Sequence, residues 1–143
     1  MQPRALKIGV IAVVSFLAAA SGGYAEQMKF MAELKGSEEV PPVQTSATGM
    51  ANITYDSESK NLSWTIEHSG LSGDVSAAHF HGPAGPGENA PPIVPIDVSA
   101  LAKGSATLDE AQASALTEGR LYVNLHTAAN PDGEIRGQVM KAQ

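Results

Sequence analysis

Apolar and polar residues alternate along much of this chain, and this period of two is the feature that most limits what it can fold into. The clearest run is residues 62–68, in which Leu62, Trp64 and Ile66 share one parity and polar residues lie between them. Successive side chains of a strand point to opposite faces, so such a run buries one face and exposes the other. We therefore predict short β-strands as the main elements.

Turns rich in Gly, Pro, Asn and Asp separate the alternating runs. Residues 56–61 are expected to join two strands into a hairpin, and residues 128–133 to join the last two. The predicted strands cover residues 28–35, 50–55, 62–68, 75–81, 93–98, 104–108, 121–127 and 134–140.

One short helix is predicted near residues 108–118. Thr107 and Glu110 have capping-box spacing before it, and Gly119 is placed to end it. Many strands and one helix indicate an all-β, antiparallel fold with Greek-key connections. Both an immunoglobulin-like sandwich and a barrel fit this pattern.

The first 25 residues have the pattern of a secretory signal peptide. Arg4 and Lys7 precede an apolar run over residues 8–20, and small residues lead to Ala25, after which we predict cleavage. A single domain, residues 26–143, would then be periplasmic or secreted. The apolar run is too short to span a bilayer and no later segment is long enough, so we expect no stable membrane insertion.

Charge and cysteine content exclude several functions. Removal of the signal peptide takes two of nine basic residues and leaves seven against fifteen acidic ones, a net charge of −8. Such a surface repels a phosphate backbone, so nucleic acid is excluded as a partner. The chain has no cysteine, so a transition metal would have to be held by histidine nitrogen, with carboxylate, amide or water oxygen completing the set.

Three of the four histidines are predicted to lie on one outer face of the sheet. His79 and His81 are two residues apart on one strand and therefore share a face, while Phe80 between them faces the core. In the strand over residues 121–127 the leucines and valine occupy the core parity, which leaves His126 on the outer face.

This set predicts a metal site outside the core, with copper as the expected ion and zinc as the alternative. The Gly- and Pro-rich loop after His81 is positioned to cover it. The other interpretation of such histidines is an exposed cluster without metal.

His68 is a candidate fourth ligand. It shares the parity of Leu62 and should point inward, but it lies at a strand end before Gly70, where a bulge can turn it toward the others. The alternative is a rim histidine hydrogen-bonded to a carbonyl or water.

Four segments in order resemble the CHRD domain family: residues 39–42 (Glu-Val-Pro-Pro), 78–82 (Ala-His-Phe-His-Gly), 121–127 (Leu-Tyr-Val-Asn-Leu-His-Thr) and 133–138 (Gly-Glu-Ile-Arg-Gly-Gln). The resemblance covers about residues 29–139. It implies an extracellular module and assigns no reaction.

A more distant resemblance is to the copper half of the Cu/Zn superoxide dismutases, which are Greek-key barrels with the metal outside. It implies that His79 and His81 match the paired copper ligands, His126 the later ligand, and Arg136 the arginine that guides the anion. This chain has no bridging histidine, zinc-ligand cluster or disulfide cysteine, so only a zinc-free copper site is implied. Arg136 could instead form a surface ion pair or a cross-strand contact.

Two classes of function follow. The first is an exported copper-binding protein with redox or superoxide-handling activity, for which metal binding is better founded than catalysis. The second is a non-catalytic extracellular interaction or structural module without metal, in which the histidines join Tyr122, Asn124 and Glu134 in a hydrogen-bonded patch.

Overall fold

A computed structural model describes residues 25–143, so the predicted signal peptide lies outside the described residues except for Ala25. The elements are almost all strands, with one α-helix and two short 3-10 helices. In chain order they are β1 (Gln27–Lys35), η1 (Gly36–Glu38), β2 (Thr48–Asp56), β3 (Asn61–Ser69), β4 (Val75–His81), β5 (Pro92–Ile96), η2 (Val98–Ala100), β6 (Gly104–Thr107), α1 (Glu110–Thr117), β7 (Tyr122–Thr127), β8 (Ile135–Gln138) and β9 (Met140–Lys141).

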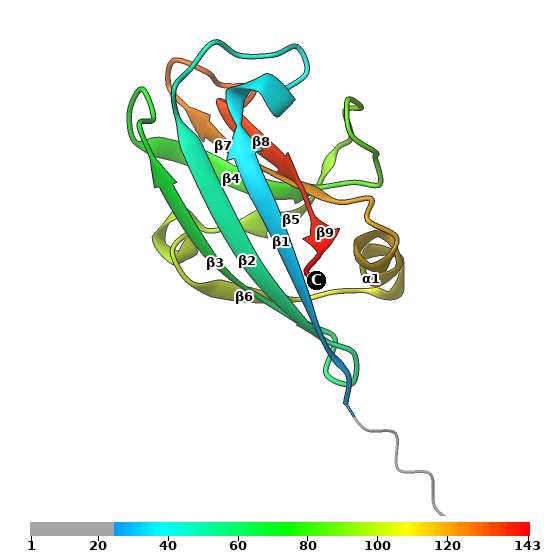
Figure 1. The fold of residues 1–143 in the computed structure, drawn as a ribbon. Coiled ribbons are helices and arrows are strands. Elements are labelled where there is room, and N and C mark those ends of the chain that lie inside the picture. Colours follow the sequence, from blue (N-terminus) through cyan, green and yellow to red (C-terminus); the bar gives the residue numbers. More distant parts are fainter. Residues whose placement is uncertain (1–24) are drawn as a thin grey trace, which may run out of the picture.

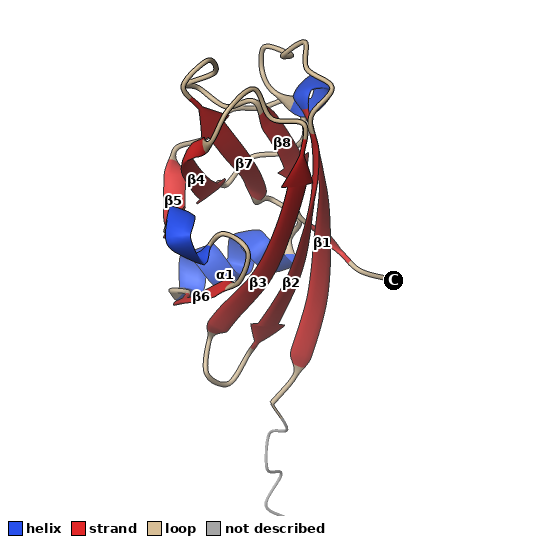
Figure 2. Ribbon diagram, turned by 90° about the vertical axis from the view of Figure 1, so that its left-hand side faces the viewer, coloured by secondary structure: helices blue, strands red, loops and turns tan. Residues whose placement is uncertain are grey.

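The strands pair antiparallel in the order β5-β4-β7-β8-β1-β2-β3-β6, with β9 added beside part of β1. This sheet curls into a nearly closed barrel, in which β1, β2 and β3 form one wall and β4, β5, β7 and β8 the other (Figures 1 and 2). The chain leaves β3 for β4 and β6 for β7 by crossing to non-neighbouring positions. The predicted all-β antiparallel class and both predicted strand pairs are confirmed.

The core lies inside this barrel and follows the predicted parity. Leu62, Trp64 and Ile66 of β3 are buried, and Phe80 of β4 is fully buried with its ring centroid 5.5 Å from that of Trp64. Each buried side chain of this size contributes about 1.5–3 kcal/mol of hydrophobic stabilisation. Phe80 therefore anchors β4 inward, and its two histidine neighbours must point outward.

Two predicted strands differ in the structure. The strand expected to reach Val98 ends at Ile96, because the Asp97 side chain accepts a hydrogen bond from the Ser99 N–H and begins η2. The two-residue strand β9 was not predicted as a separate element; it pairs with β1 through Met31 and Phe30.

The capping box of α1 also differs from the prediction, because Thr107 belongs to β6. Asp109 is the N-cap: its carboxylate accepts from the Gln112 N–H at 2.8 Å, and the Gln112 side chain accepts from the Asp109 N–H at 2.9 Å. Gly119 follows the helix with φ +71°, as its predicted role as a stop requires.

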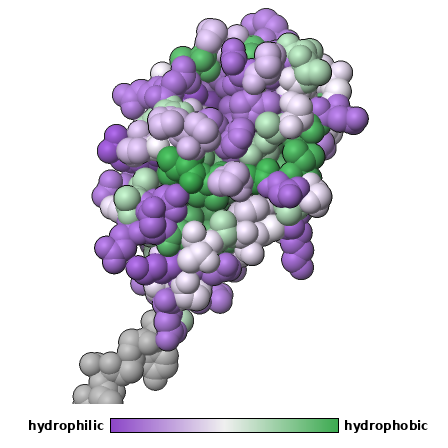
Figure 3. Space-filling model, turned by 180° about the vertical axis from the view of Figure 1, so that it is seen from behind, coloured by the Kyte–Doolittle hydropathy of each residue, from purple (hydrophilic) through white to green (hydrophobic). Residues whose placement is uncertain are grey.

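Within residues 25–143 no helix combines the length and apolar character needed to cross a membrane. The face opposite that of Figure 1 is mostly hydrophilic around a central apolar area (Figure 3). The large apolar side chains exposed among these residues are Met31, Val98 and Met140.

Candidate metal centre

The register of β4 against β7 brings three histidines together on the outer wall of the barrel. His79 lies opposite Asn124, and His126 lies opposite Ala77, so His79 and His126 are diagonal neighbours across the two strands. One ring nitrogen from each of His79, His81 and His126 lies within 4.8 Å of the others. Nδ1 of His79 is 3.3 Å from Nε2 of His126. The predicted grouping outside the core is therefore what the structure shows.

Backbone carbonyls orient two of these rings. Nδ1 of His126 is 2.8 Å from the Pro131 carbonyl, and Nδ1 of His81 is 2.9 Å from the Ala90 carbonyl. A ligating histidine commonly donates its second ring N–H to such an oxygen, which fixes the tautomer and the ring plane. Nε2 of His126 thus faces His79, whereas Nε2 of His81 lies 2.9 Å from Oδ1 of Asn124.

The surroundings favour neutral rings at two of the three positions. Burial lowers the pKa of His79, and the nearby His126 and His81 lower it further. Burial also lowers the pKa of His81, against the opposing effect of its hydrogen bonds to Ala90 and Asn124. Neutral imidazole is the form that binds a metal ion.

The loop of residues 82–91 covers one side of the group, as the sequence suggested. The Tyr122 hydroxyl bonds the Ala90 carbonyl at 3.1 Å, and the Tyr122 ring stacks on His81 with centroids 4.7 Å apart. His81 is buried, whereas His79 and His126 are half-buried. The site is therefore closed on the His81 side and accessible on the other.

Arg136 takes no part in a surface ion pair. It is 2% exposed, its guanidinium lies 3.4 Å from the centroid of the Tyr122 ring, and it donates to the Asn89 side chain at 2.9 Å and to the Glu88 carbonyl. Because β7 lies between β4 and β8, Tyr122 separates this guanidinium from His81. The cross-strand contact considered for Arg136 is present, and the guanidinium is covered by the loop.

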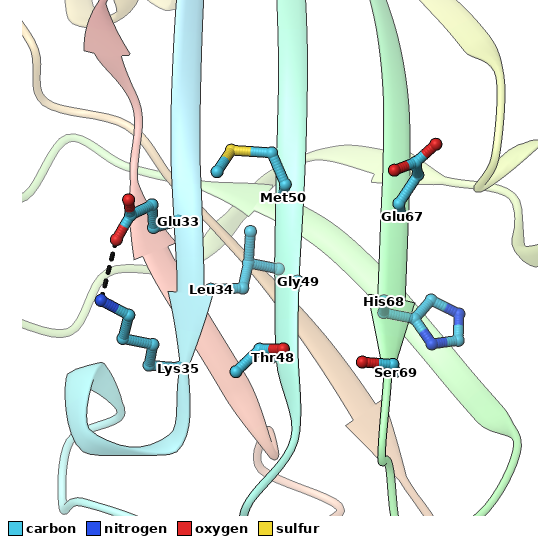
Figure 4. A pocket seen from close by; sticks show the side chains of 9 residues that line it. All are labelled: Glu33, Leu34, Lys35, Thr48, Gly49, Met50, Glu67, His68 and Ser69. Atoms are coloured by element: carbon cyan, nitrogen blue, oxygen red, sulfur yellow. Dashed lines mark hydrogen bonds and ion pairs between the residues drawn. The ribbon is translucent and has the colours of Figure 1, made fainter.

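His68 lies apart from the three-histidine group. It occupies the same cross-strand row as Gly49 and Leu34, which is the inward parity, but at the rim of the barrel its side chain is exposed. There it lines a hollow of about 490 Å³ over β1, β2 and β3, beside the ion pair of Glu33 with Lys35 at 2.8 Å (Figure 4). Parity correctly gave the side of the strand, and the position is the rim position that was the alternative to a fourth ligand.

Two polar residues lie beside the group: Asn124 was predicted only as part of the metal-free hydrogen-bonded patch, and Glu39 was not predicted. Asn124 is 3% exposed, and its Oδ1 lies 2.9 Å from Nε2 of His81. Glu39 is 6% exposed, and its Oε1 has no hydrogen-bond partner among the described residues. Burial raises the pKa of Glu39 to about 7, against the lowering effects of Arg136 and Asn124. The parity that Asn124 shares with His126 is what placed it in that predicted patch.

Gly133 explains how Asn124 and Glu39 come together. A Cβ at this position would lie 2.5 Å from Oε1 of Glu39 and 2.6 Å from Nδ2 of Asn124, and the residue has φ +123°. Both polar groups therefore occupy space that only glycine leaves open, in a backbone conformation that glycine adopts readily.

Fold and site together define an antiparallel β-barrel with a histidine cluster on its outer wall. The family model described as "CHRD domain" matches residues 30–139, and the chain belongs to this family. It is 33% identical over 129 residues to a protein named Chordin from Xenopus laevis, covering 83% of this chain and 14% of that protein. The chain thus spans about a seventh of that relative's length. No solved structure matches the chain.

Proposed function

We propose that this CHRD domain is an exported protein that binds a transition metal ion through His79, His81 and His126, with copper as the expected ion and zinc as the alternative. The observation that carries the proposal is the convergence of three ring nitrogens within 4.8 Å on the outer wall of the barrel. Imidazole suits both metals, and copper heads the affinity series. Export is supported by the signal-like pattern of residues 1–25.

The spacing of the nitrogens gives a further reason. Two nitrogens bound at about 2.0 Å in a tetrahedral arrangement lie about 3.3 Å apart, whereas a square-planar pair at right angles lies about 2.8 Å apart. The distance from His79 Nδ1 to His126 Nε2 is 3.3 Å. This one distance is compatible with the tetrahedral or trigonal surroundings that Cu(I) and Zn(II) accept.

The residues around the histidines have separate tasks in this proposal. The carbonyls of Ala90 and Pro131 orient His81 and His126, and Tyr122 with the loop over it excludes water from the His81 side. The half-buried side at His79 and His126 leaves room for a small molecule. A bound copper ion would supply one-electron redox chemistry there, which includes superoxide handling.

Metal titration tests the proposal directly. The purified chain is titrated with Cu(I), Cu(II) and Zn(II) by calorimetry and competition, beside a His79→Ala/His81→Ala double variant. Loss of two of the three ligands should weaken metal binding by about 100-fold or more. Removal of a residue that only hydrogen-bonds a ligand already weakens metal binding by about 10–100-fold. His68→Ala is the matched control and should bind like the wild type. Unchanged affinity in the double variant would contradict the proposal.

The pH dependence gives a second test. Binding should weaken as the pH falls through the histidine range below about 6.5, because a protonated imidazole has no lone pair for the metal. Since the pKa values of His79 and His81 are lowered, the fall should extend further into acid than for an exposed histidine peptide. An affinity that stays constant across this range would argue against imidazole ligation.

Redox activity is measured separately from binding. The copper-loaded chain should consume superoxide faster than the metal-free chain if the open side of the site admits it. Equal rates with and without copper would leave a metal-binding protein without this activity. A chain that takes up no metal at all would favour the interaction or structural module instead.

A further inference from the structure

His81 differs from the other two site histidines because both of its ring nitrogens face oxygen atoms. Nδ1 lies 2.9 Å from the Ala90 carbonyl, and Nε2 lies 2.9 Å from Oδ1 of Asn124. A neutral imidazole carries one N–H, so whichever nitrogen holds the proton, the other directs its lone pair at an oxygen lone pair. The Ala90 carbonyl belongs to the backbone, whereas the Asn124 carboxamide can rotate.

Rotation of the Asn124 amide by half a turn removes this conflict. Nδ2 then donates to Nε2 of His81, while the Nδ1–H of His81 remains on the Ala90 carbonyl. The Asn124 oxygen moves to the place now held by Nδ2, whose contact with the Asp132 carbonyl is 3.5 Å, at the long limit for a hydrogen bond. The position now held by Nδ2 is close to Oε1 of Glu39, because both atoms border the space beside Gly133.

Glu39 can form a hydrogen bond with the oxygen of the rotated amide only when the carboxyl carries a proton. A protonated carboxyl donates to the Asn124 oxygen, and an ionised carboxylate accepts from Nδ2 instead. In the protonated state the Oε1 atom, which has no partner in the present orientation, can gain one. The carboxyl and the amide therefore form a pair in which the proton of one sets the orientation of the other.

The charged and titratable groups around Glu39 are few. Arg136 approaches from β8, and His81 lies beyond Asn124 on β4. Asp132, on the turn before β8, and Glu38, the preceding residue, are both exposed. The balance of these groups with burial places the pKa of Glu39 at about 7, so its proton occupancy changes near neutral pH.

We propose that Glu39 and Asn124 are a positioning pair that controls access to Nε2 of His81, so that metal binding is accompanied by release of the Glu39 proton. With Glu39 protonated, the Asn124 N–H occupies the Nε2 lone pair. When the proton leaves, the amide turns its N–H to the carboxylate, which is the present orientation, so that Oδ1 faces Nε2 and no N–H donor occupies its lone pair. The proton passes to solvent through the 200 Å³ hollow lined by Glu39, Pro131 and Asp132. This inference rests on the proposed metal-binding function.

Proton counting tests the metal-dependent part. Zn(II), which undergoes no redox change, is titrated into the chain by calorimetry in buffers of different ionisation enthalpy. At about pH 6 the wild type should release about one proton more than Glu39→Gln, and at about pH 8.5 the difference should vanish, because Glu39 is then already ionised. Protons released by the histidines are common to both proteins. Glu38→Gln is the matched control and should release as many protons as the wild type.

A double-variant comparison separates positioning from a merely structural role. If Asn124 transmits the effect, Glu39→Gln should change the proton count in the wild-type background and leave it unchanged in an Asn124→Ala background. An equal change in both backgrounds would overturn the part assigned to Asn124.

The metal-free chain provides an independent measurement. The ¹⁵N resonance of His81 Nε2 should follow a titration near pH 7 in the wild type and in Glu38→Gln, and this step should be absent in Glu39→Gln. Absence of the step from the wild type overturns the positioning pair. If the wild type and Glu39→Gln bind metal and release equal numbers of protons, the positioning pair is overturned while the proposed metal-binding function stands. A wild-type chain that binds no metal overturns both the positioning pair and the proposed function.

Discussion

Glu134 and Glu39 are both buried carboxylates, at 1% and 6% exposure, but their surroundings give them opposite properties. Glu134 accepts hydrogen bonds from the hydroxyls of Thr45, Ser72 and Thr127 and from the Ser72 N–H. Burial raises its pKa, but these hydrogen bonds outweigh burial and bring the pKa to about 2. Glu39 has an Oε1 without a partner, and burial raises its pKa to about 7.

The comparison shows that hydrogen bonding, more than burial, decides whether an enclosed carboxyl is a structural or a titrating group in this barrel. Glu134 joins three segments, since Thr45 precedes β2, Ser72 precedes β4 and Thr127 ends β7. Its depressed pKa contributes stability that is present above pH 4.5 and is lost as the pH falls toward 2. The contribution of Glu39 has the opposite sign: it is present below pH 4.5 and is lost as the pH rises through about 7.

Replacement of Glu134 should produce the largest effect. Glu134→Ala leaves the Ser72, Thr127 and Thr45 donors without their acceptor, and we expect the free energy of unfolding to fall by about 3–5 kcal/mol. Urea unfolding near neutral pH measures this change. Glu67→Ala, at an exposed position of β3, is the matched control and should change stability by about 0.5 kcal/mol or less. A loss for Glu134→Ala no larger than this would refute the structural role of the carboxylate.

Most of the fold could be predicted from the sequence because its signals are local. The alternation of Leu62, Trp64 and Ile66 with polar residues is visible within one strand, and the same rule placed Phe80 in the core. Predictions were wrong where an aspartate inside the expected segment capped a helix and so moved the boundary. Asp97 caps η2, so β5 ends at Ile96 and not at Val98, and Asp109 caps α1 in place of the expected Thr107.

Alteration of Gly133 should have the next largest effect, because it crowds Glu39 directly. In Gly133→Ala the new methyl group would lie within 2.6 Å of Glu39 Oε1 and Asn124 Nδ2, at a φ of +123°. We expect a loss of about 2–3 kcal/mol in the free energy of unfolding. Gly73→Ala is the control, since a Cβ there meets nothing within 4 Å. Comparable losses in the two variants would mean that the space beside Glu39 is unimportant.

The histidine group and Asn124 were predictable and Glu39 was not, for the same physical reason. His79, His81 and His126 follow from strand parity and one strand pairing. The position of Glu39 depends on the path of the chain after η1 and on its meeting with Gly133, which lies far away in the sequence. The exposure of His68 depends on where the barrel opens, and parity carries no information about that.

The Glu39→Gln variant should sharpen the comparison through its pH dependence. A neutral amide avoids the burial of a charge, so the variant should gain stability relative to the wild type as the pH rises from about 4.5 to about 8. The expected gain is about 2–3 kcal/mol, since a pKa raised from 4.5 to about 7 corresponds to about 3 kcal/mol before solvent screening. Urea unfolding at several pH values measures the difference. A constant difference across this range would show that Glu39 titrates like an exposed carboxyl.

The smallest predicted effect comes from the removal of one hydrogen bond that lowers the pKa of Glu134, which makes this carboxylate more like that of Glu39. Ser72→Ala removes the hydroxyl that donates to Glu134 at 2.6 Å while the Ser72 N–H donor remains. We expect a loss of about 1–1.5 kcal/mol near neutral pH and an acid-unfolding midpoint at higher pH, because fewer hydrogen bonds then hold the pKa of Glu134 down. Ser76→Ala, at an exposed position of β4, is the control. If Ser72→Ala leaves the acid midpoint in place, the remaining donors alone account for the low pKa of Glu134, and the contrast with Glu39 does not depend on the number of hydrogen bonds.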